Sequence, residues 1–370
     1  MNAKKNLTRR NFIKNSAIMG TGLTLGAPLL LRCASTMESG PVHYPKLPGQ
    51  KIQSPEHYGL EGCMIGYYPG SVTARYPEHA ISYTGNKVGK SPSILHLNNR
   101  RSRIPHGIYN SFTDSMIQTA NFGVIPFVSY DGRYGDEYSS SNILKEIIKG
   151  KHNVPIRDSA TKLREKYGEI YGGFFIQTLR EMNMPHTWPP WGGRPREFKK
   201  AWKHIWKIFD DEGASKYATW VWSPYVSSDR VAESPDRYYP GDHYVDWIGL
   251  NGYNFWGQAH PGGRFYQSFS YLFERDYYSV LKNYPDKPMM IAATGTDENK
   301  YKPEWIAEAF SSLRDNFKGI KAVCWWDIHW SHGPTKNFDS RIDSSPEALQ
   351  AYREGISDPH FLGKVPYRKN

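Results

Sequence analysis

The sequence predicts an α/β protein folded as a single (β/α)₈ TIM barrel. Between residues 60 and 330, short apolar runs rich in β-branched and aromatic residues alternate with longer segments of helical periodicity. No internal repeat and no second linker interrupts this alternation. An open sheet covered on both faces is the alternative, but so many strands are difficult to arrange in one such sheet. The closed barrel is therefore the favoured fold.

The expected strands and helices follow one another along the chain. The apolar runs expected to form strands lie at 63–68, 93–98, 123–130, 172–180, 217–224, 246–253, 288–295 and 322–328. The clearest amphipathic segments between them lie at 111–122, 158–171, 195–213 and 302–317. The active site of such a barrel forms at the carboxyl ends of the strands. Polar residues directly after each run are therefore the candidates for chemistry.

The N-terminal segment is typical of an export signal. Residues 8–14, "TRRNFIK", resemble a twin-arginine signal, and the apolar stretch after them is too short and too glycine-rich for a membrane span. Cys33 stands where a lipid-acceptor cysteine would lie, although Arg32 replaces the small residue usual before it. We expect residues 1–33 to be removed and the protein to be periplasmic or at the cell surface. Lipid anchoring at Cys33 stays open.

Composition limits the partners expected for the mature chain. Residues 1–33 carry six Lys or Arg and no Asp or Glu, so their removal lowers the net charge from +11 to +5. That excess is too mild to indicate nucleic acid as a partner. Residues 34–56, rich in Pro, Gly, Ser and Lys, are the expected linker, and 57–365 form the expected barrel. Because the sequence has no metal-ligand spacing and no phosphate-binding glycine loop, we expect neither a metal nor a cofactor. We also expect a monomer.

Two cysteines remain after the signal. Cys63 and Cys324 fall on the first and last expected strands, which become neighbours when a barrel closes. Two buried thiols are the favoured state, and a disulfide formed after export is the alternative.

Aromatic residues make up 15% of the chain, with 12 Trp and 26 Tyr. Flat aromatic rings pack well against sugar rings, so this excess favours a carbohydrate ligand, although a large aromatic core explains it equally well. The string "TLREMNMPHTWPPWGG" places Glu181 at the end of the fourth expected strand. A carboxyl group beside aromatic walls loses hydration and its pKa rises, which suits a proton donor. An ion pair with Arg180 is the structural alternative.

Several strings together resemble glycoside hydrolase family 26, a clan A barrel family that includes β-mannanases. They are "REMN…WPPW…AWKHIWKIFDDEGA…WVWSP", "YYPGDHYVDWIGLNGYN", "KPMMIAATGT" and "RIDSSPEALQAYREGI", and the likeness runs from about residue 120 to 358. The resemblance implies a (β/α)₈ barrel that cleaves a polysaccharide or oligosaccharide in a groove at its mouth. The family's enzymes retain anomeric configuration.

The resemblance also implies roles for individual residues. Glu181 matches the acid/base glutamate, and Tyr253 matches a tyrosine close to the nucleophile. The side chains expected to contact the substrate are Asp131, Asn183, Trp188, Trp191, Trp256 and Trp326. Core packing is the alternative role for the tryptophans.

Two positions depart from the family pattern. Ala293 stands where the resemblance puts the nucleophilic glutamate, and a methyl group cannot attack an anomeric carbon. Arg180 replaces the histidine common before the acid/base glutamate. If it faced Glu181, its charge would favour the carboxylate and oppose proton donation. It could instead bind a uronate carboxylate or a sulfate, or form a structural ion pair.

These departures leave several readings open. Inverting hydrolysis needs a relocated carboxylate to hold water opposite Glu181, and the candidates, each also a plausible loop or cap residue, are Asp131, Asp297, Glu298 and Asp327. Elimination beside a uronate carboxyl needs a base and a cation but no nucleophile, and Tyr253, Glu181 and Arg180 could serve. A polysaccharide lyase or an oligosaccharide dehydratase would work in this way. A glycan-binding protein without catalysis is a third reading, and a substitution made to trap substrate is a fourth.

Overall fold

The computed structural model describes residues 51–70, 76–98, 110–130, 142–185, 189–228, 232–255, 265–331 and 337–364. The expected export signal with Cys33 lies outside these residues, as do most of the expected linker and the site candidates Asp131, Trp188 and Trp256. In the part that is described, no helix is long and apolar enough to cross a membrane.

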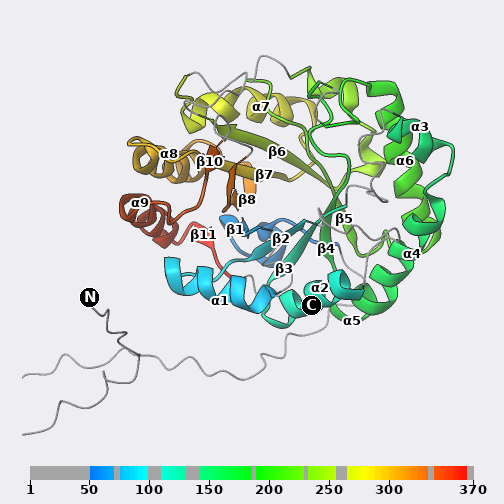
Figure 1. Ribbon diagram of the computed structural model, residues 1–370, viewed down its shortest axis with the longest axis horizontal. Coiled ribbons are helices and arrows are strands. Elements are labelled where there is room, and N and C mark those ends of the chain that lie inside the picture. The colour runs from blue at the N-terminus through cyan, green and yellow to red at the C-terminus, as the bar shows by residue number, and fades with distance from the viewer. Residues whose placement is uncertain are drawn as a thin grey trace, which may run out of the picture. The chain divides into compact units, whose positions relative to one another are not determined.

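The strands form a closed parallel barrel, as the sequence predicts. Strands β1 to β8 pair in chain order, and β8 also pairs with β1, which closes the sheet (Figure 1). Their bounds are β1 Cys63–Tyr68, β2 Ile94–Asn98, β3 Ile125–Ser129, β4 Phe174–Gln177, β5 Ala218–Trp222, β6 Trp247–Asn254, β7 Met289–Thr296 and β8 Ile320–Trp326. Every predicted strand therefore overlaps an observed one.

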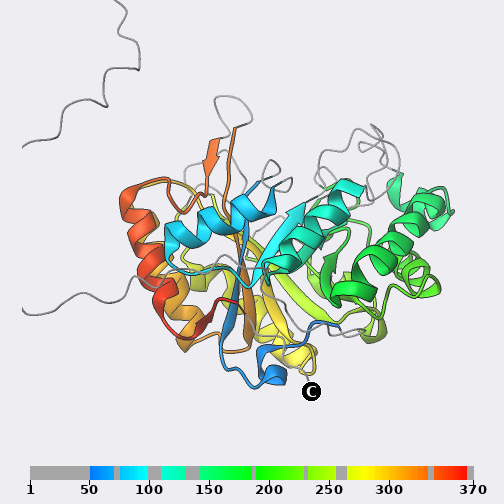
Figure 2. The ribbon, with the colours of Figure 1, turned by 90° about the horizontal axis from the view of Figure 1, so that it is seen from below.

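Helices surround the barrel (Figure 1). Their bounds are α1 Pro77–Val88, α2 Asn110–Asn121, α3 Ile143–Ile148, α4 Asn153–Leu163, α5 Glu169–Tyr171, α6 Pro195–Asp211, α7 Phe269–Asn283, α8 Lys302–Asp315 and α9 Pro346–Ser357. A π-helical turn at Arg164–Gly168 joins α4 to α5. A short strand, β11 Phe361–Leu362, pairs with β1, and the hairpin of β9 His329–Ser331 and β10 Asn337–Asp339 extends from one end of the barrel (Figure 2).

Helix α6 shows why these segments pack as they do. Its buried side chains recur every three or four residues and include Phe198, Trp202, Ile205 and Phe209. The Trp202 indole N–H donates to the carbonyl of Tyr244 at 3.1 Å, so burial of the ring leaves no polar atom unpaired. This apolar stripe fixes α6 against the outer face of the barrel wall.

Residues 51–56 belong to the packed structure, although the sequence assigns them to the linker. Ile52 is buried, its N–H donates to Thr219 Oγ1 at 2.7 Å, and its carbonyl accepts from the indole of Trp247 at 3.1 Å. Lys51 pairs with Asp246 at 2.8 Å. The polar composition of these residues does not indicate packing. The segment is held by backbone hydrogen bonds and not by a long apolar run.

The two described cysteines are free and buried, as favoured from the sequence. Cys63 packs with the cluster between the barrel and the helices, whereas Cys324 packs inside the barrel. Burial raises the pKa of both thiols. The barrel wall therefore separates two unreactive thiols.

Gly66 provides a test of the packing inside the barrel. A Cβ at this position would lie 2.7 Å from Cys324 Sγ and 2.9 Å from Ile94 Cβ. We expect Gly66→Ala to lower the free energy of unfolding by about 1–3 kcal/mol in urea denaturation, because overpacking strains a dense core. Adding Cys324→Ala removes the nearer atom and should recover part of this loss. Equal stability of Gly66→Ala and the parent protein would contradict this packing.

Candidate active site at the carboxyl end of the barrel

Backbone contacts place Glu181 and Ala293 at the same level of the barrel. The N–H of Glu181 donates to the carbonyl of Ser223 at 2.8 Å, and the N–H of Asn251 donates to the carbonyl of Pro224 at 3.0 Å. Asn251 is in turn the register partner of Ala293. These steps connect the segments after β4 and β5 to β6 and β7 at their carboxyl ends. Glu181 and Ala293 therefore lie at the same end of the barrel.

The segment that carries Glu181 has an uncommon backbone. Leu179 and Glu181 have φ of 49° and 58°, a left-handed conformation that costs free energy for residues with a Cβ. Buried neighbours hold it, since Leu179 and Met182 are fully buried and the Met184 N–H donates to the carbonyl of Glu181. The side chain of Glu181 is partly exposed. Strain of this kind concentrates at functional sites.

A β-bulge in β7 turns two successive alanines toward the barrel interior. The register between β7 and its neighbours shifts at Ala292 and Ala293. Ala292 packs with the inner cluster of the barrel, and Ala293 packs with Tyr68 and Trp326 at its mouth. Without the bulge, adjacent residues of a strand would face opposite sides. The bulge therefore aims position 293 into the site.

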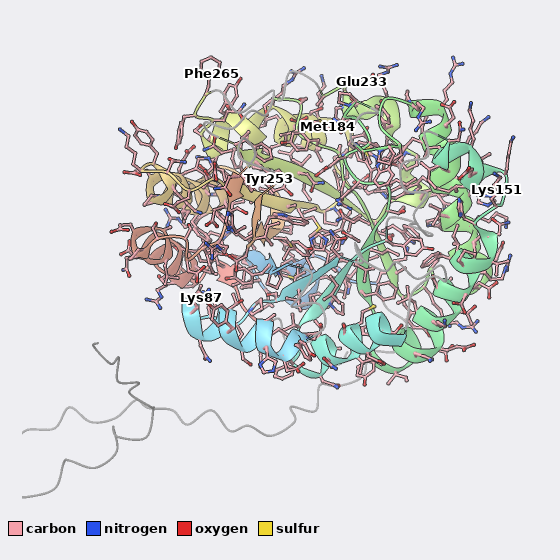
Figure 3. All side chains as sticks on the ribbon, viewed as in Figure 1. Lys87, Lys151, Met184, Glu233, Tyr253 and Phe265 are labelled. Atoms are coloured by element: carbon pink, nitrogen blue, oxygen red, sulfur yellow. The ribbon has the colours of Figure 1, made fainter. Side chains whose placement is uncertain are left out.

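Aromatic rings line the space around Ala293. Tyr68 and Trp326 stack with their ring centroids 3.8 Å apart, and Tyr253 and Ile328 pack against the same cluster. The Tyr253 and Trp326 rings meet edge to face at 6.4 Å. Figure 3 shows Tyr253 inside the ring of helices. Tyr253 thus packs beside Ala293.

A buried polar network lies just below this level. His96 Nε2 is 2.6 Å from Ser129 Oγ and 3.2 Å from Gln177 Nε2. Burial, reinforced by the positive charge of Arg180, lowers the pKa of His96 to about 3. Arg180 is itself buried at 7% exposure. The interior below the mouth therefore holds a neutral imidazole and a fixed positive charge.

Two asparagine amides at the mouth were missed from the sequence. Asn98 and Asn251 are 4% and 0% exposed, and within the part of the chain that the structure describes, neither amide atom of either has a hydrogen-bond partner. Both occupy inward positions of their strands, since each lies two residues after another inward residue, His96 and Gly249. The sequence does hold a signal for both asparagines. They are polar residues at inward-facing, alternate positions near the ends of the strands "SILHLN" and "DWIGLNGY".

Asn183 and Trp191 stabilise the loop that holds Glu181. Asn183 accepts from the Tyr225 N–H at 2.8 Å and donates to the carbonyls of Tyr225 and Glu233 at 2.8 and 3.0 Å. Trp191 is 1% exposed, and its indole donates to the carbonyl of Arg180 at 2.7 Å. In these placements both side chains make protein contacts, which favours packing over sugar stacking for Trp191. Trp326, at 7% exposure, lies at the mouth itself.

The described carboxylates proposed to hold an attacking water make structural contacts. Asp297 accepts from the N–H of Asp339 at 2.8 Å and from that of Glu298 at 3.0 Å. Glu298 pairs with Lys302 at 3.4 Å. Asp327 accepts from the N–H of Ile342 at 2.8 Å. These contacts match the loop and cap roles that were the alternative for each residue.

Comparisons with known proteins agree with this geometry. A model of glycosyl hydrolase family 26 matches residues 156–323. Endoglucanase H of Acetivibrio thermocellus is 33% identical over 294 residues, which cover 74% of this chain and 30% of that protein. A beta-1,3-xylanase of Alcaligenes sp. is 24% identical over 50% of this chain and 46% of its own length. The chain thus spans less than half the length of these curated relatives.

Solved structures confirm the barrel. A family 26 β-mannanase from Bacteroides ovatus superposes with a TM-score of 0.63 at 14% identity, over 86% of this chain and 97% of that one. A mannanase from Bacillus subtilis gives a TM-score of 0.57 at 18% identity, over 84% and 89%. The chain therefore has the (β/α)₈ barrel fold of these structures. It is a relative of glycosyl hydrolase family 26, as the sequence motifs imply.

Asn251 and Asn183 form a matched pair for a stability test, since both are buried amides of the same size. Leucine at 251 replaces an amide without partners, so we expect Asn251→Leu to raise the free energy of unfolding by about 1 kcal/mol. Asn183→Leu removes three hydrogen bonds and should lower it by about 1–3 kcal/mol. Urea denaturation of both variants checks this. A loss of stability in both would show that the Asn251 amide is satisfied in solution.

Asp327 should make stability depend on pH. Burial raises its pKa from the ordinary value to about 6, so the folded state holds its proton more tightly than the unfolded state does. Its contribution to the free energy of unfolding is then largest below about pH 4 and falls by about 2–3 kcal/mol as the pH rises to about 6. We expect Asp327→Asn to remove this fall in urea titrations between pH 4 and 7. An unchanged pH profile would contradict the shift.

Proposed function

We propose that this protein cleaves glycosidic bonds of a polysaccharide or oligosaccharide at the barrel mouth, with Glu181 as the proton-transferring residue. The observation that carries this proposal is the shared level of Glu181, Tyr253 and position 293 at the carboxyl end of the barrel. The family relationship supports a polysaccharide-degrading glycosidase in general terms. Export through the twin-arginine route, with a lipid anchor at Cys33 as an option, is part of the proposal and rests on the sequence motif.

The cleavage step is not the double displacement typical of the family. Ala293 points into the site but has no oxygen with which to form a glycosyl-enzyme bond. Glu181 can still protonate the leaving oxygen, because that task needs only a carboxyl group within reach of the bond. We therefore assign the proton transfer to Glu181. We assign the attack on the anomeric carbon to no residue of the protein.

Elimination from a uronate-bearing glycan is the second candidate. It is favoured by the structural contacts that Asp297, Glu298 and Asp327 make, because each of these carboxylates already has a role in holding the loops. In this route Tyr253 would remove the proton beside the uronate carboxyl. Arg180 would stabilise the developing charge, and Glu181 would protonate the departing oxygen. The product is an unsaturated uronate.

Mass spectrometry of products tests the proposal. Purified protein is incubated with neutral, uronate-bearing and acetamido-bearing oligosaccharides, and a mass gain of one water means hydrolysis, whereas fragments without added water that absorb ultraviolet light mean elimination. Glu181→Gln should slow cleavage by roughly 10²–10⁴-fold, because the amide cannot transfer the proton. Glu274→Gln, on the exposed face of α7, is the matched control and should keep full activity.

Two results would contradict the proposal. Full activity in Glu181→Gln would remove that residue from the proton transfer. Binding of a glycan without any change in its mass would leave a carbohydrate-binding protein instead of an enzyme.

A further inference from the structure

Helix α6 carries a row of positive charges on the side that faces away from the barrel. The exposed side chains at the spacing of one helix face are Arg196, Lys200, Lys203 and Lys207, and this set is called the basic face of α6. From Arg196 to Lys207 it extends about 16 Å along the helix axis. Within the described residues only Lys207 of this set forms an ion pair, with Asp211 at 2.8 Å. The face therefore presents cations that are available to a partner.

Helix stability does not explain where these charges lie. Anions are favoured near the N-terminus of a helix and cations near its C-terminus, and a solvated face commonly mixes both signs. Helix α6 has largely the reverse order, because Arg196 lies in its first turn and Asp210 and Asp211 lie in its last. Glu197, also in the first turn, is the exception. The basic face thus opposes the helix dipole, which favours an anionic partner outside the chain.

The basic face begins beside the loop that carries Glu181. The chain leaves β4 through this loop and enters α6 at Pro195, so the first turn of α6 lies at the carboxyl end of the barrel. The Gly193 N–H donates to the carbonyl of Met182 at 3.3 Å, which holds the approach to the helix against the Glu181 segment. A polymer seated at the mouth can therefore extend over Arg196 and along α6.

This surface fits a hydrated polymer better than a lipid membrane. A helix that lies on a membrane exposes apolar side chains beside its basic ones. The apolar side chains of α6, such as Trp202 and Phe209, are buried against the barrel. Among the described residues, no exposed large apolar side chain belongs to α6 or to α3, which packs beside it (Figure 1). Helix α3 and its C-cap instead add two exposed lysines, Lys145 and Lys149.

We propose that the substrate is an acidic polysaccharide, bearing carboxylate or sulfate groups, and that the basic face of α6 binds the part of its chain that extends beyond the mouth. The choice of a polysaccharide as the ligand rests on the proposed function, and the acidic groups name the class of substrate for that same site. A single ionic contact in water is weak, so affinity arises from several contacts along one chain. Salt therefore weakens the binding.

Matched polymers test the ligand. Dextran sulfate and dextran share one backbone and differ in sulfate groups, whereas carboxymethyl cellulose and hydroxyethyl cellulose share another and differ in carboxylate groups. We expect calorimetry to show an anionic polymer binding about tenfold or more tightly than its neutral partner, as several ionic contacts along one chain predict. Raising the salt from about 50 to about 200 mM should weaken this binding about tenfold or more, as counterion release predicts for a linear polyanion. The two pairs distinguish sulfate from carboxylate.

A triple variant tests the basic face. Combined Arg196→Gln, Lys200→Gln and Lys203→Gln should weaken binding of the anionic polymer about tenfold, because each exposed ionic contact supplies a factor of about two. The midpoint of urea denaturation should stay at the parent value, since within the described residues none of the three forms an ion pair and Arg196 opposes the helix dipole. Lost affinity at unchanged stability separates binding from a structural role.

A second triple variant with the same change of charge is the matched control. Combined Lys282→Gln, Lys300→Gln and Lys318→Gln removes three exposed lysines from other parts of the surface. Lys300 lies 4.7 Å from the centre of a tyrosine ring, as Lys203 does, so both variants lose one cation–π contact. The control should bind the anionic polymer as the parent protein does.

The outcomes are distinct. Equal affinity for anionic and neutral polymers, or equal losses in the two triple variants, would overturn the acidic substrate. Binding through the basic face to phosphatidylglycerol vesicles, but to neither anionic polymer, would overturn it in favour of a membrane. Cleavage confined to neutral glycans would overturn it and leave the proposed function intact. Charge-dependent binding through α6 without cleavage of any glycan would support the basic face as a docking surface and contradict the proposed function.

Discussion

The parallel pairing of β8 with β1 is the constraint on which the site depends. Register places Tyr68 beside Trp326, so the first and last strands supply the two rings that stack at the mouth. If the sheet were open, Tyr68 and Ala293 would lie toward opposite edges and no common cluster could form. Closure also removes the unpaired edges of the sheet, which would otherwise need protection. The site is therefore a property of the whole barrel.

Strand positions could be predicted well because buried parallel strands are short and continuously apolar. Local backbone features could not. The run predicted at 172–180 shortens to Phe174–Gln177, because Leu179 and Glu181 leave the extended conformation. The bulge in β7 has no signal in "PMMIAATG", since small apolar residues suit either face and do not fix the register. Its effect on Ala293 therefore needed the structure.

The candidate site was predictable to the extent that it follows from strand ends. Glu181, Tyr253 and Trp326 lie at the carboxyl end of the barrel. Trp191 lies further along the same loop, and its indole N–H donates to the carbonyl of Arg180. Position along the chain cannot show which way a ring turns, because that depends on which nearby backbone group lacks a hydrogen bond. Asn251 was not predicted because it lies within a strand, and only polar residues after strand ends were considered.

Position 293 and its register partner are best understood together. An unpaired buried amide costs roughly 1–3 kcal/mol, a large share of a stability of about 5–15 kcal/mol. The inner cluster of the barrel contains apolar side chains such as Met64, Ile94 and Met290, whereas Asn251 is a buried amide without a partner among the described residues. A carboxylate at 293 could use Asn251 Nδ2 but not Oδ1. Alanine beside asparagine leaves both the donor and the acceptor of this amide without a partner among the described residues.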